Sequence, residues 1–244
     1  MPENPLPVTL IPDAHNPNPD ITFDQFHDLI PVSRETWQKF QIYIRLLLEA
    51  QQRFNLIAPS TIPQLWRRHL LDSAQLWPLI PPGTRSLLDF GSGAGFPGLV
   101  LSIMGVPEVR MAEGNPHKAQ FLEQVGRELG LTIKVLGQRF NQLTPQPADV
   151  ITARALAPLE DLLALAQPFR YPHTRCLWPK GRGYQAEIHQ ANQRWDATIR
   201  FHPSLVHQGG VILVIDHYQR RKKTAQNHGR RQSEGRGWQN HHRY

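Results

Sequence analysis

Cysteine is nearly absent from this chain, since Cys176 is the single one among 244 residues. One cysteine excludes an internal disulfide and a cysteine-based zinc site, and its place in the apolar segment 174–178 predicts a buried, unreactive thiol. Long hydrophobic runs are missing as well, because nowhere do about 18 uncharged apolar residues follow one another. The N-terminus has neither the basic nor the apolar part of a signal peptide. We therefore expect a cytoplasmic protein, and the 40% hydrophobic content suffices for a folded core.

Most of the chain has no excess of either charge. Residues 1–216 carry 19 Lys and Arg against 19 Asp and Glu, whereas residues 217–244 carry 8 against 1. The net charge of +7 therefore comes from the C-terminal segment, where Gln, Asn, Gly and His separate the cations without any apolar period. This composition predicts a basic tail that is disordered when free and able to hold RNA phosphates.

The sequence predicts no metal site. Its twelve histidines are scattered. His69 and Asp72 lie three residues apart in a helical segment, but no third ligand is close to them in the sequence, and zinc sites use at least three protein ligands. We expect hydrogen bonds within the N-terminal helices for this pair instead.

Proline content and apolar spacing divide the chain into regions. Six prolines predict a flexible leader before residue 21. Apolar residues then recur every three or four positions after Ser33 and again over 62–77, which predicts two helices of an N-terminal cap. The expected leader, helical cap, α/β domain and basic tail have the bounds 1–20, 21–80, 84–216 and 217–244.

Short apolar strands alternate with helical segments in the α/β domain, which indicates successive βα units. The last two strands are joined by the turn 208–210 without a helix and should form an antiparallel hairpin. The fold class is therefore α/β, with a Rossmann-like, mostly parallel sheet of seven strands and helices on both faces. Expected strands are 86–89, 109–112, 132–136, 149–153, 174–178, 199–202 and 211–215, and expected helices are 97–104, 117–129, 159–169 and 184–193.

A glycine-rich loop follows the first strand. Asp89 closes that strand, and glycines at 91, 93 and 95 allow positive φ and let the backbone approach a ligand. The segment Gly93-x-Gly95-x-x-Gly98 matches the dinucleotide fingerprint, so the loop predicts a nucleotide-like cofactor, either NAD or S-adenosylmethionine. Glu113 ends the next strand, 24 residues after Asp89, where an acid accepts hydrogen bonds from ribose hydroxyls in both cases.

The first part of this loop, from Asp89 to Gly95, favours S-adenosylmethionine over NAD. The continuous Asp-x-Gly-x-Gly-x-Gly string from Asp89 to Gly95 resembles motif I of class I S-adenosylmethionine-dependent methyltransferases. The antiparallel final pair of strands is also the methyltransferase arrangement. A dehydrogenase usually carries a separate substrate domain, for which 244 residues leave little space. An NAD-dependent oxidoreductase is therefore the weaker alternative.

The Phe96-Pro97-Gly98 end of the loop narrows the class further. The segment 89–98 resembles the RsmG/GidB family of small-subunit rRNA guanine-N7 methyltransferases. Five other segments are similar to this family in the same order, and the resemblance extends from about residue 33 to 216; the segments are 53–57, 66–73, 113–122, 152–157 and 179–181.

The resemblance implies transfer of a methyl group from S-adenosylmethionine to N7 of a guanine in the 530 loop of 16S rRNA (position 527). The substrate would be the rRNA, the 30S subunit or its assembly intermediate. Guanine N7 already has an in-plane lone pair, so no general base is required, and orientation and electrostatics should supply most of the catalysis. A non-catalytic small-subunit assembly factor is an alternative, because Asn141 departs from the family pattern and the tail is basic.

Arg154 follows the fourth strand at the ligand edge of the sheet, and the resemblance implies that it reaches the active site. A donor on N7 would block the reaction, so a basic residue here should address O6 or a phosphate. The alternative is an ion pair with Glu160 or Asp161 that only holds the loop.

The resemblance also implies cofactor contacts at Gly91 and Phe96, and places Phe140 and Asn141 beside the adenine. Where the family often has Arg-x-Glu, this chain has Arg139-Phe140-Asn141, so only a backbone contact is expected from Asn141. The complete set of expected cofactor residues is Asp89, Gly91, Gly93, Gly95, Phe96, Glu113, Phe140, Asn141 and Arg154, with Arg154 also catalytic.

Three further cations are expected to contact RNA. Arg139 and Lys180 lie at strand ends, and Lys118 opens a helix whose backbone amides favour phosphate. For Arg139 and Lys180, solvated surface charges remain the alternative.

Overall fold

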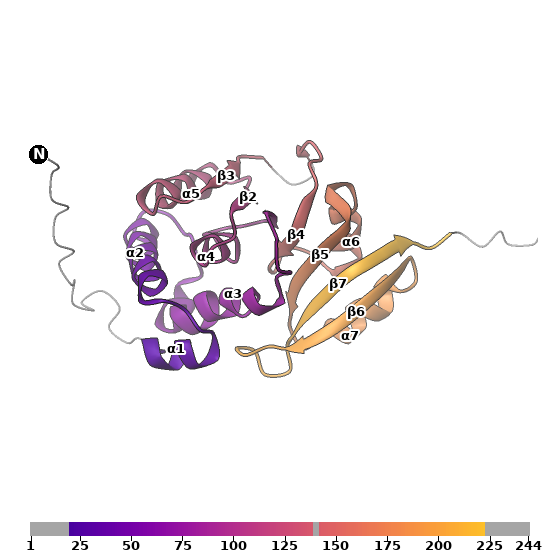
Figure 1. The fold of residues 1–244 in the computed structure, drawn as a ribbon, viewed down its shortest axis with the longest axis horizontal. Helices are drawn as coiled ribbons and strands as arrows, with labels where there is room; N and C mark the ends of the chain where they lie inside the picture. The colour runs from indigo at the N-terminus through magenta and orange to yellow at the C-terminus, as the bar shows by residue number, and fades with distance from the viewer. Residues whose placement is uncertain (1–19, 139–141, 223–244) are drawn as a thin grey trace, which may run out of the picture.

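The computed structural model describes residues 20–138 and 142–222, and these form one seven-stranded sheet with helices on both faces (Figure 1). The strand order is β3-β2-β1-β4-β5-β7-β6. β1 to β5 are parallel, whereas β7 runs antiparallel to both β5 and β6. The strands are β1 (Ser86–Phe90), β2 (Glu108–Ala112), β3 (Ile133–Leu136), β4 (Ala148–Ala153), β5 (Arg170–Lys180), β6 (Trp195–Pro203) and β7 (Val211–Arg220). The predicted mostly parallel sheet with a final antiparallel pair is confirmed.

Consecutive strand residues point to opposite faces of the sheet, and the two faces have separate hydrophobic cores. Leu87 belongs to the core that contains α1 to α5, and Leu88 belongs to the core with α6 and α7. The α-helices are α1 (Phe23–Leu29), α2 (Arg34–Gln51), α3 (Asp72–Ala74), α4 (Gly98–Ile103), α5 (Pro116–Glu128), α6 (Leu159–Ala166) and α7 (Tyr184–Ala191). The 3-10 and π-helical turns are η1 (Pro59–Gln64), η2 (Trp66–Leu71), η3 (Trp77–Leu79) and η5 (Gln167–Phe169).

The N-terminal helices are built into the larger core and have no core of their own. Thr22 and Gln25 form a capping box at α1, and the Ser33 hydroxyl caps α2 by accepting from Thr36 N–H. Phe40 and Leu47 of α2 are fully buried in the same core as α4 and α5. The expected bound between residues 80 and 84 therefore separates two chain segments that share one core.

The predicted helix over 62–77 is confirmed only in part, because the segment is helical but changes its helix type and has other bounds. Pro63, which has no backbone N–H, lies in the 3-10 turn η1, and the chain continues through the π-helical turn η2 before the short α3. Apolar periodicity persists through these turns because one face of each is buried. Irregular turns of this kind are frequent at functional sites, and η2 and α3 carry Arg68, His69 and Asp72.

Several predicted element bounds are also corrected. β5 and β6 are longer than expected, and α4 begins at Gly98 with Pro97 as its N-cap. β7 continues to Arg220, so the predicted start of the tail at 217 is wrong. Tyr218 packs at right angles to Trp195 and is buried, which stabilises this extension of the strand. The rest of the predicted leader and tail lies outside the described residues.

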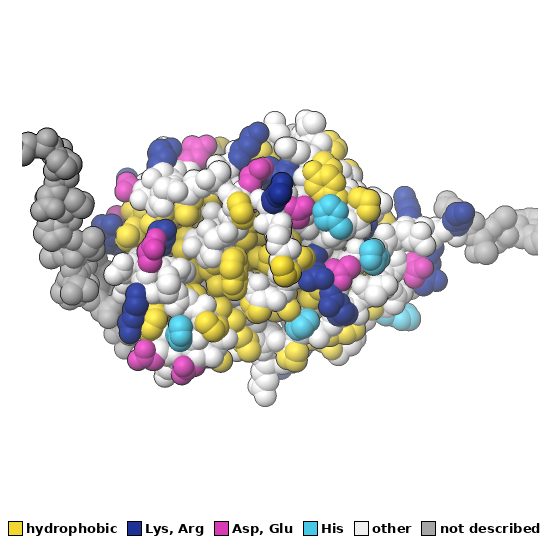
Figure 2. Space-filling model, in the orientation of Figure 1, with side chains coloured by type: hydrophobic (Ala, Val, Ile, Leu, Met, Phe, Trp, Pro, Cys, Tyr) yellow, Lys and Arg dark blue, Asp and Glu magenta, His cyan; other side chains and the backbone are white. Residues whose placement is uncertain are grey.

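The surface charges of the described part are mixed. In Figure 2, Lys and Arg side chains lie interspersed with Asp and Glu over the face shown, in agreement with the balanced charge of residues 1–216. No helix within residues 20–138 and 142–222 combines the length and apolar character needed to cross a bilayer.

Candidate functional site

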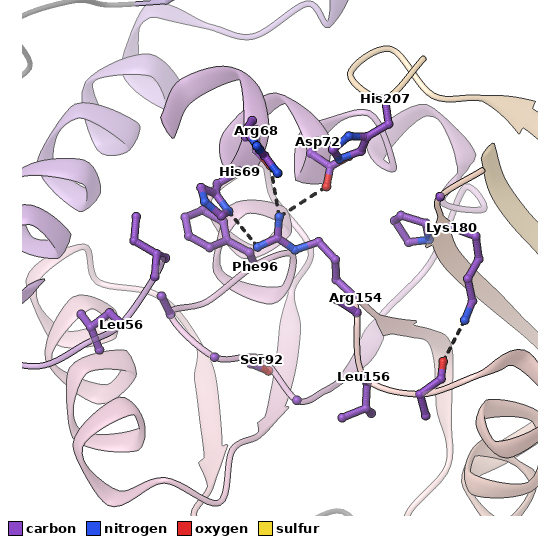
Figure 3. A pocket seen from close by; sticks show the side chains of 18 of the residues that line it. Leu56, Arg68, His69, Asp72, Ser92, Phe96, Arg154, Leu156, Lys180 and His207 are labelled. Atoms are coloured by element: carbon purple, nitrogen blue, oxygen red, sulfur yellow. Dashed lines mark hydrogen bonds and ion pairs between the residues drawn. The ribbon is translucent and has the colours of Figure 1, made fainter. Parts of the chain in front are cut away.

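A pocket of about 780 Å³ opens at the carboxyl ends of β1, β4 and β5 (Figure 3). The chain passes from β1 to β2 on one side of the sheet, while β4 pairs with β1 on the other side, so the pocket lies at the switch in strand order. Ligands bind at this place in open α/β sheets. The lining consists of residues 91–94 and 96 after β1, 154–158 after β4, 179–181 at the end of β5, Leu56, Ile57, Arg68, His69 and Asp72 of the N-terminal segment, and Glu187 and His207.

The glycine-rich loop forms one wall of this pocket. Gly91 and Gly93 line it with φ of +67° and +57°. Gly95 has φ of +108°, and a Cβ there would lie 2.4 Å from Cδ1 of Leu99. Side chains are excluded at Gly95 by both conformation and space. Gly95 lies outside the pocket lining and shapes the loop from behind.

Asp89 lies beneath the loop, fully buried, and does not line the pocket. Its Oδ1 accepts from the Thr152 hydroxyl at 2.7 Å, and its Oδ2 accepts from Gly98 N–H at 3.2 Å. Asp89 therefore joins β1 to β4 and to the start of α4. Burial raises the pKa of Asp89 to about 6, although these two hydrogen bonds oppose the shift.

Asp89→Asn is expected to remove a pH dependence of stability. Below about pH 4 the carboxyl is protonated in the folded and unfolded chains alike. Between about pH 4 and pH 6 the unfolded chain ionises first, so the wild type should lose roughly 3 kcal/mol of unfolding free energy relative to the variant. Urea denaturation of both proteins from pH 4 to 7 measures this difference. A constant difference across the range would contradict the buried, protonated carboxyl.

Tyr43 holds the loop from the opposite side. This side chain of α2 is fully buried, and its hydroxyl donates to the Ala94 carbonyl at 2.6 Å. Its ring also packs near Phe96, with centroids 5.4 Å apart. Burial raises the pKa of Tyr43 well above its usual value, so the hydroxyl keeps its proton. Sequence analysis did not identify Tyr43, because its apolar helical position is typical of an ordinary core residue.

Glu113 follows β2 and binds backbone amides in this structure. Its Oε2 accepts from Gly93 N–H at 2.8 Å, and its Oε1 accepts from Asn115 N–H at 2.7 Å. The carboxylate therefore contacts the glycine-rich loop, as its predicted role requires, but lies outside the pocket lining. Its contact with a ribose stays a prediction.

Arg154 points into the pocket from the end of β4 and contacts the N-terminal segment (Figure 3). Its Nη2 donates to Nδ1 of His69 at 2.9 Å. Its Nη1 donates to the Arg68 carbonyl at 3.2 Å and to Oδ2 of Asp72 at 3.4 Å. The guanidinium carbon lies 5.2 Å from the ring centroid of Phe96, within the range of a cation–π contact.

The alternative ion pair of Arg154 with Glu160 or Asp161 is wrong. Glu160 pairs with Arg194 at 2.7 Å, and the partner of Arg154 is Asp72. Ala155, the next residue, has φ of +50°, a conformation that alanine rarely adopts. Strained residues of this kind concentrate at functional sites.

The hydrogen bonds of His69 define its tautomer. The Thr61 hydroxyl donates to the Ala58 carbonyl at 2.7 Å, so its oxygen is left to accept from Nε2–H of His69 at 2.8 Å. Nδ1 is then the acceptor for Arg154. Burial, followed by the charge of Arg154, lowers the pKa of His69 to about 3, so the imidazole is neutral at physiological pH. The hydrogen bonds that were expected within the N-terminal helices are those of His69 with Thr61 and of Asp72 with Gln75. The bonds of both residues with Arg154, 85 residues away from His69, were not expected.

Asp72 is connected to the β6–β7 hairpin through Gln75. Asp72 is almost completely buried, and burial raises its pKa, while the charge of Arg154 opposes the shift. Gln75 Nε2 donates to Oδ1 of Asp72 at 2.8 Å, and Gln75 Oε1 accepts from Leu205 N–H at 2.8 Å. His207, on the same hairpin turn, has Nε2 3.7 Å from Oδ1 of Asp72. The hairpin is thereby fixed to the pocket wall.

Gln75→Leu is expected to lower the free energy of unfolding by about 2 to 3 kcal/mol, because at nearly constant volume it removes one hydrogen bond from the buried Asp72 carboxylate and leaves the Leu205 amide without its acceptor. Hydrogen exchange at the Leu205 amide should accelerate at the same time. Gln120→Leu, on the exposed face of α5, is the matched control. Unchanged exchange at Leu205 in the Gln75 variant would contradict the role of this side chain.

Lys180 lies at the far wall of the pocket in a nearly buried ion pair. Its Nζ donates to Oε2 of Glu187 at 2.7 Å and to the Ala157 carbonyl at 2.8 Å. Glu187 Oε2 also accepts from Leu159 N–H, so the pair joins β5, α7 and the loop after β4. The alternative of a solvated surface charge is wrong, and RNA contact by Lys180 stays a prediction.

The remaining predicted residues are not brought into the pocket. Lys118 lies in the first turn of α5, whose Asn115 cap accepts from the Lys118 amide. Arg139, Phe140 and Asn141 lie outside the described residues. Within residues 20–138 and 142–222, no group of three or more His, Cys, Asp or Glu could hold a metal ion.

Comparison with known proteins assigns this chain to a family. Residues 36–219 match the GidB family, described as rRNA small subunit methyltransferase G. The chain belongs to this family. The family predicted from the motifs is therefore confirmed. Because this is a methyltransferase family, the alternative of an NAD-dependent oxidoreductase is wrong.

Relatives and solved structures agree with this assignment. The ribosomal RNA small subunit methyltransferase G of Paramagnetospirillum magneticum is 47% identical over 184 residues, which cover 75% of this chain and 90% of the relative. The protein of the same name from Rhodospirillum centenum is 45% identical over 199 residues, covering 82% and 92%. The crystal structure of a ribosomal protein L11 methylase from Lactobacillus delbrueckii has a TM-score of 0.52 at 14% identity and covers 61% of this chain and 78% of its own. This likeness confirms the predicted class I methyltransferase fold.

Proposed function

We propose that this protein transfers the methyl group of S-adenosylmethionine to N7 of a guanine in the 530 loop of 16S rRNA, within the small subunit or its assembly intermediate. One observation carries the proposal: the glycine-rich loop and Arg154 meet in one pocket at the switch in strand order, in a member of the rRNA small subunit methyltransferase G family. The RNA contacts of Lys118, Lys180 and Arg139 are part of the proposal.

The residues of the pocket fit S-adenosylmethionine. The cofactor supplies an electrophilic methyl group on a sulfonium sulfur. Gly91 and Gly93 would let it approach the loop backbone, since a Cβ at Gly91 would meet Leu156 at 2.9 Å on the pocket wall. Glu113 would hold the ribose hydroxyls, because each of its oxygens accepts one amide hydrogen bond and can accept another. Phe96 lines the same wall.

Arg154 has the hydrogen-bonding capacity to orient a guanine. Three of its five N–H donors bind Arg68, Asp72 and His69, and the donors left over are on Nε and Nη2. Within residues 20–138 and 142–222 these donors form no hydrogen bond, and they would bind O6 of the base or a phosphate. Because the bound partners hold the guanidinium in place, these donors are oriented before the base arrives.

The chain needs no base to activate N7, whose lone pair is available at neutral pH. His69, neutral with its Nδ1 already accepting from Arg154, would orient that side chain rather than take a proton. The residues of the pocket would therefore act by aligning N7 with the methyl carbon and by excluding water.

Incubation with labelled S-adenosylmethionine and undermethylated 30S particles tests the proposal, with N7-specific chain scission to locate the label. Naked 16S rRNA in parallel distinguishes the two forms of substrate. Absence of label in both would contradict the proposal. Cofactor binding without transfer to any RNA would favour the non-catalytic assembly factor instead. A cytoplasmic location stays a prediction.

A further inference from the structure

The rim of the pocket continues outward along the end of β6. β6 and β5 run in the same direction on either side of β7, and Pro203 and Lys180 both pair with Val211. The carboxyl end of β6 therefore lies at the same edge of the sheet as the pocket. Of the four large hydrophobic side chains that are most exposed in the described residues, Phe201 and Leu205 lie here.

Two aromatic rings lie together at this end. Phe201 is 49% exposed, and its ring centroid is 5.9 Å from that of Tyr184, the first residue of α7. Figure 1 shows α7 against β6, close to the β6–β7 hairpin. An exposed ring costs free energy in water unless a partner covers it, so an aromatic pair at the edge of a binding pocket indicates a contact surface.

Arg182 follows Gly181 of the pocket lining and precedes Tyr184 by two residues. Its stem packs on the hairpin turn, since a Cβ at Gly209 would lie 3.1 Å from its Cγ. Gly181 and His207, which flank this contact in the sequence, line the pocket itself. Arg182 is exposed, and no acidic partner for it is found within residues 20–138 and 142–222.

One cation of this surface is not balanced by an ion pair within residues 20–138 and 142–222. The segments 171–186 and 197–215, which contain the ends of β5 and β6 and the hairpin, have no Asp or Glu. They carry four Lys or Arg. Arg175 and Arg200 pair with Asp216, and Lys180 pairs with Glu187. Arg182 forms no ion pair within the described part of the chain. A second copy of this chain on the same surface would bring like charges together, whereas a polyanion would be attracted.

We propose that Arg182, Tyr184 and Phe201 form a surface that binds the unpaired RNA strand next to the target guanine. This inference rests on the proposed function and locates part of its substrate. Arg182 binds a backbone phosphate, and the aromatic pair stacks on a neighbouring base, the combination by which proteins hold single-stranded RNA. The target base can then enter the pocket while its neighbour stays outside.

Variants of the three residues test this surface. Phe201→Ser, alone and with Tyr184→Ser, is expected to raise the KM for undermethylated 30S particles at least about tenfold, as loss of one stacked base predicts. kcat and the affinity for S-adenosylmethionine should stay unchanged. Arg182→Ala should reduce the slope of log affinity against log salt by about 1, since it removes one phosphate contact.

Tyr171→Ser is the matched control. Tyr171 is also exposed, by 41%, and its ring also stacks, on His173, but it lies at the amino end of β5, on the edge of the sheet away from the pocket. This variant should leave KM and the salt slope unchanged. Thermal denaturation of all variants separates loss of binding from loss of folding, and Phe201→Ser keeps the test valid if Tyr184→Ser destabilises α7.

Binding of a protein-free fragment of 16S rRNA, measured without cofactor, separates this inference from the proposed function. Weaker fragment binding by the Phe201 and Arg182 variants supports the surface even if no methyl transfer occurs. Unchanged fragment binding together with unchanged KM overturns it. A defect confined to protein-containing particles assigns the surface to a ribosomal protein, and a concentration-dependent dimer lost in Phe201→Ser assigns it to a second copy of the chain; either result also overturns it.

Discussion

Arg154→Ala is expected to lower the rate of methyl transfer by about 10²- to 10³-fold, the usual cost of removing one oriented donor from an active site. The side chain is held by His69, Asp72 and the Arg68 carbonyl, so its two remaining donors require no rearrangement when the guanine binds. Affinity for S-adenosylmethionine should change much less, because the glycine-rich loop does not depend on Arg154. Single-turnover methylation and isothermal titration measure the two effects separately.

Loss of Arg154 also leaves the buried carboxylate of Asp72 without its cation, which is strongly destabilising in itself. The double variant Arg154→Ala with Asp72→Asn removes that charge and should recover stability without recovering activity. Arg194→Ala is the control, since Arg194 also pairs with a carboxylate but is exposed and does not line the pocket. If Arg154→Ala kept most of its activity, Arg154 would have only the role of fixing the loop.

Gly95→Ala is expected to lower the free energy of unfolding by about 2 to 5 kcal/mol and to abolish cofactor binding. The new Cβ would lie 2.4 Å from Leu99 Cδ1 and 2.9 Å from the Tyr43 hydroxyl, at a φ of +108°. To relieve the contact, the loop must move away from Tyr43, which costs the hydrogen bond to the Ala94 carbonyl. Urea denaturation and cofactor titration check the two consequences.

Gly83→Ala separates the two causes. Gly83 has φ of +80°, but a Cβ there would meet no atom within 4 Å. This variant should show only the conformational cost, about 1 to 2 kcal/mol, with normal cofactor binding. Equal losses in the two variants would mean that the contacts with Leu99 and Tyr43 contribute little.

The number of strands and the type of fold could be predicted because the signals are local. The apolar run Val211–Ile215 and the glycine-rich turn after β1 are each contained in a few consecutive residues, and the run indicates a strand buried on both faces. The segment 59–79 could not be predicted in this way. Its apolar spacing indicates a buried face, which α, 3-10 and π turns share, so the spacing alone does not choose among them.

The contacts that hold the site residues in place could not be predicted, for a different reason. The residues at strand ends, including Arg154 and Lys180, follow from the rule that ligands bind at the carboxyl ends of parallel strands. The contacts between these residues and the other elements do not follow from this rule. Leu205 binds Gln75, 130 residues away, and Arg154 binds His69, 85 residues away. Such contacts depend on how the N-terminal helices and the hairpin pack onto the sheet, and the local sequence does not predict them.

The hydrogen bond from Tyr43 to Ala94 has a consequence for how the protein acquires its binding site. The glycine-rich loop is held from below by Asp89, which is part of the sheet, and from above by α2, which precedes the sheet in the chain. During synthesis, α2 is therefore made before the loop that it contacts, about fifty residues later in the chain. The pocket reaches its final shape only after Tyr43 and Ala94 have come into contact. A fragment that begins at β1 would contain every glycine of the loop. It would lack α2 and therefore the Tyr43 hydrogen bond that holds the loop at Ala94.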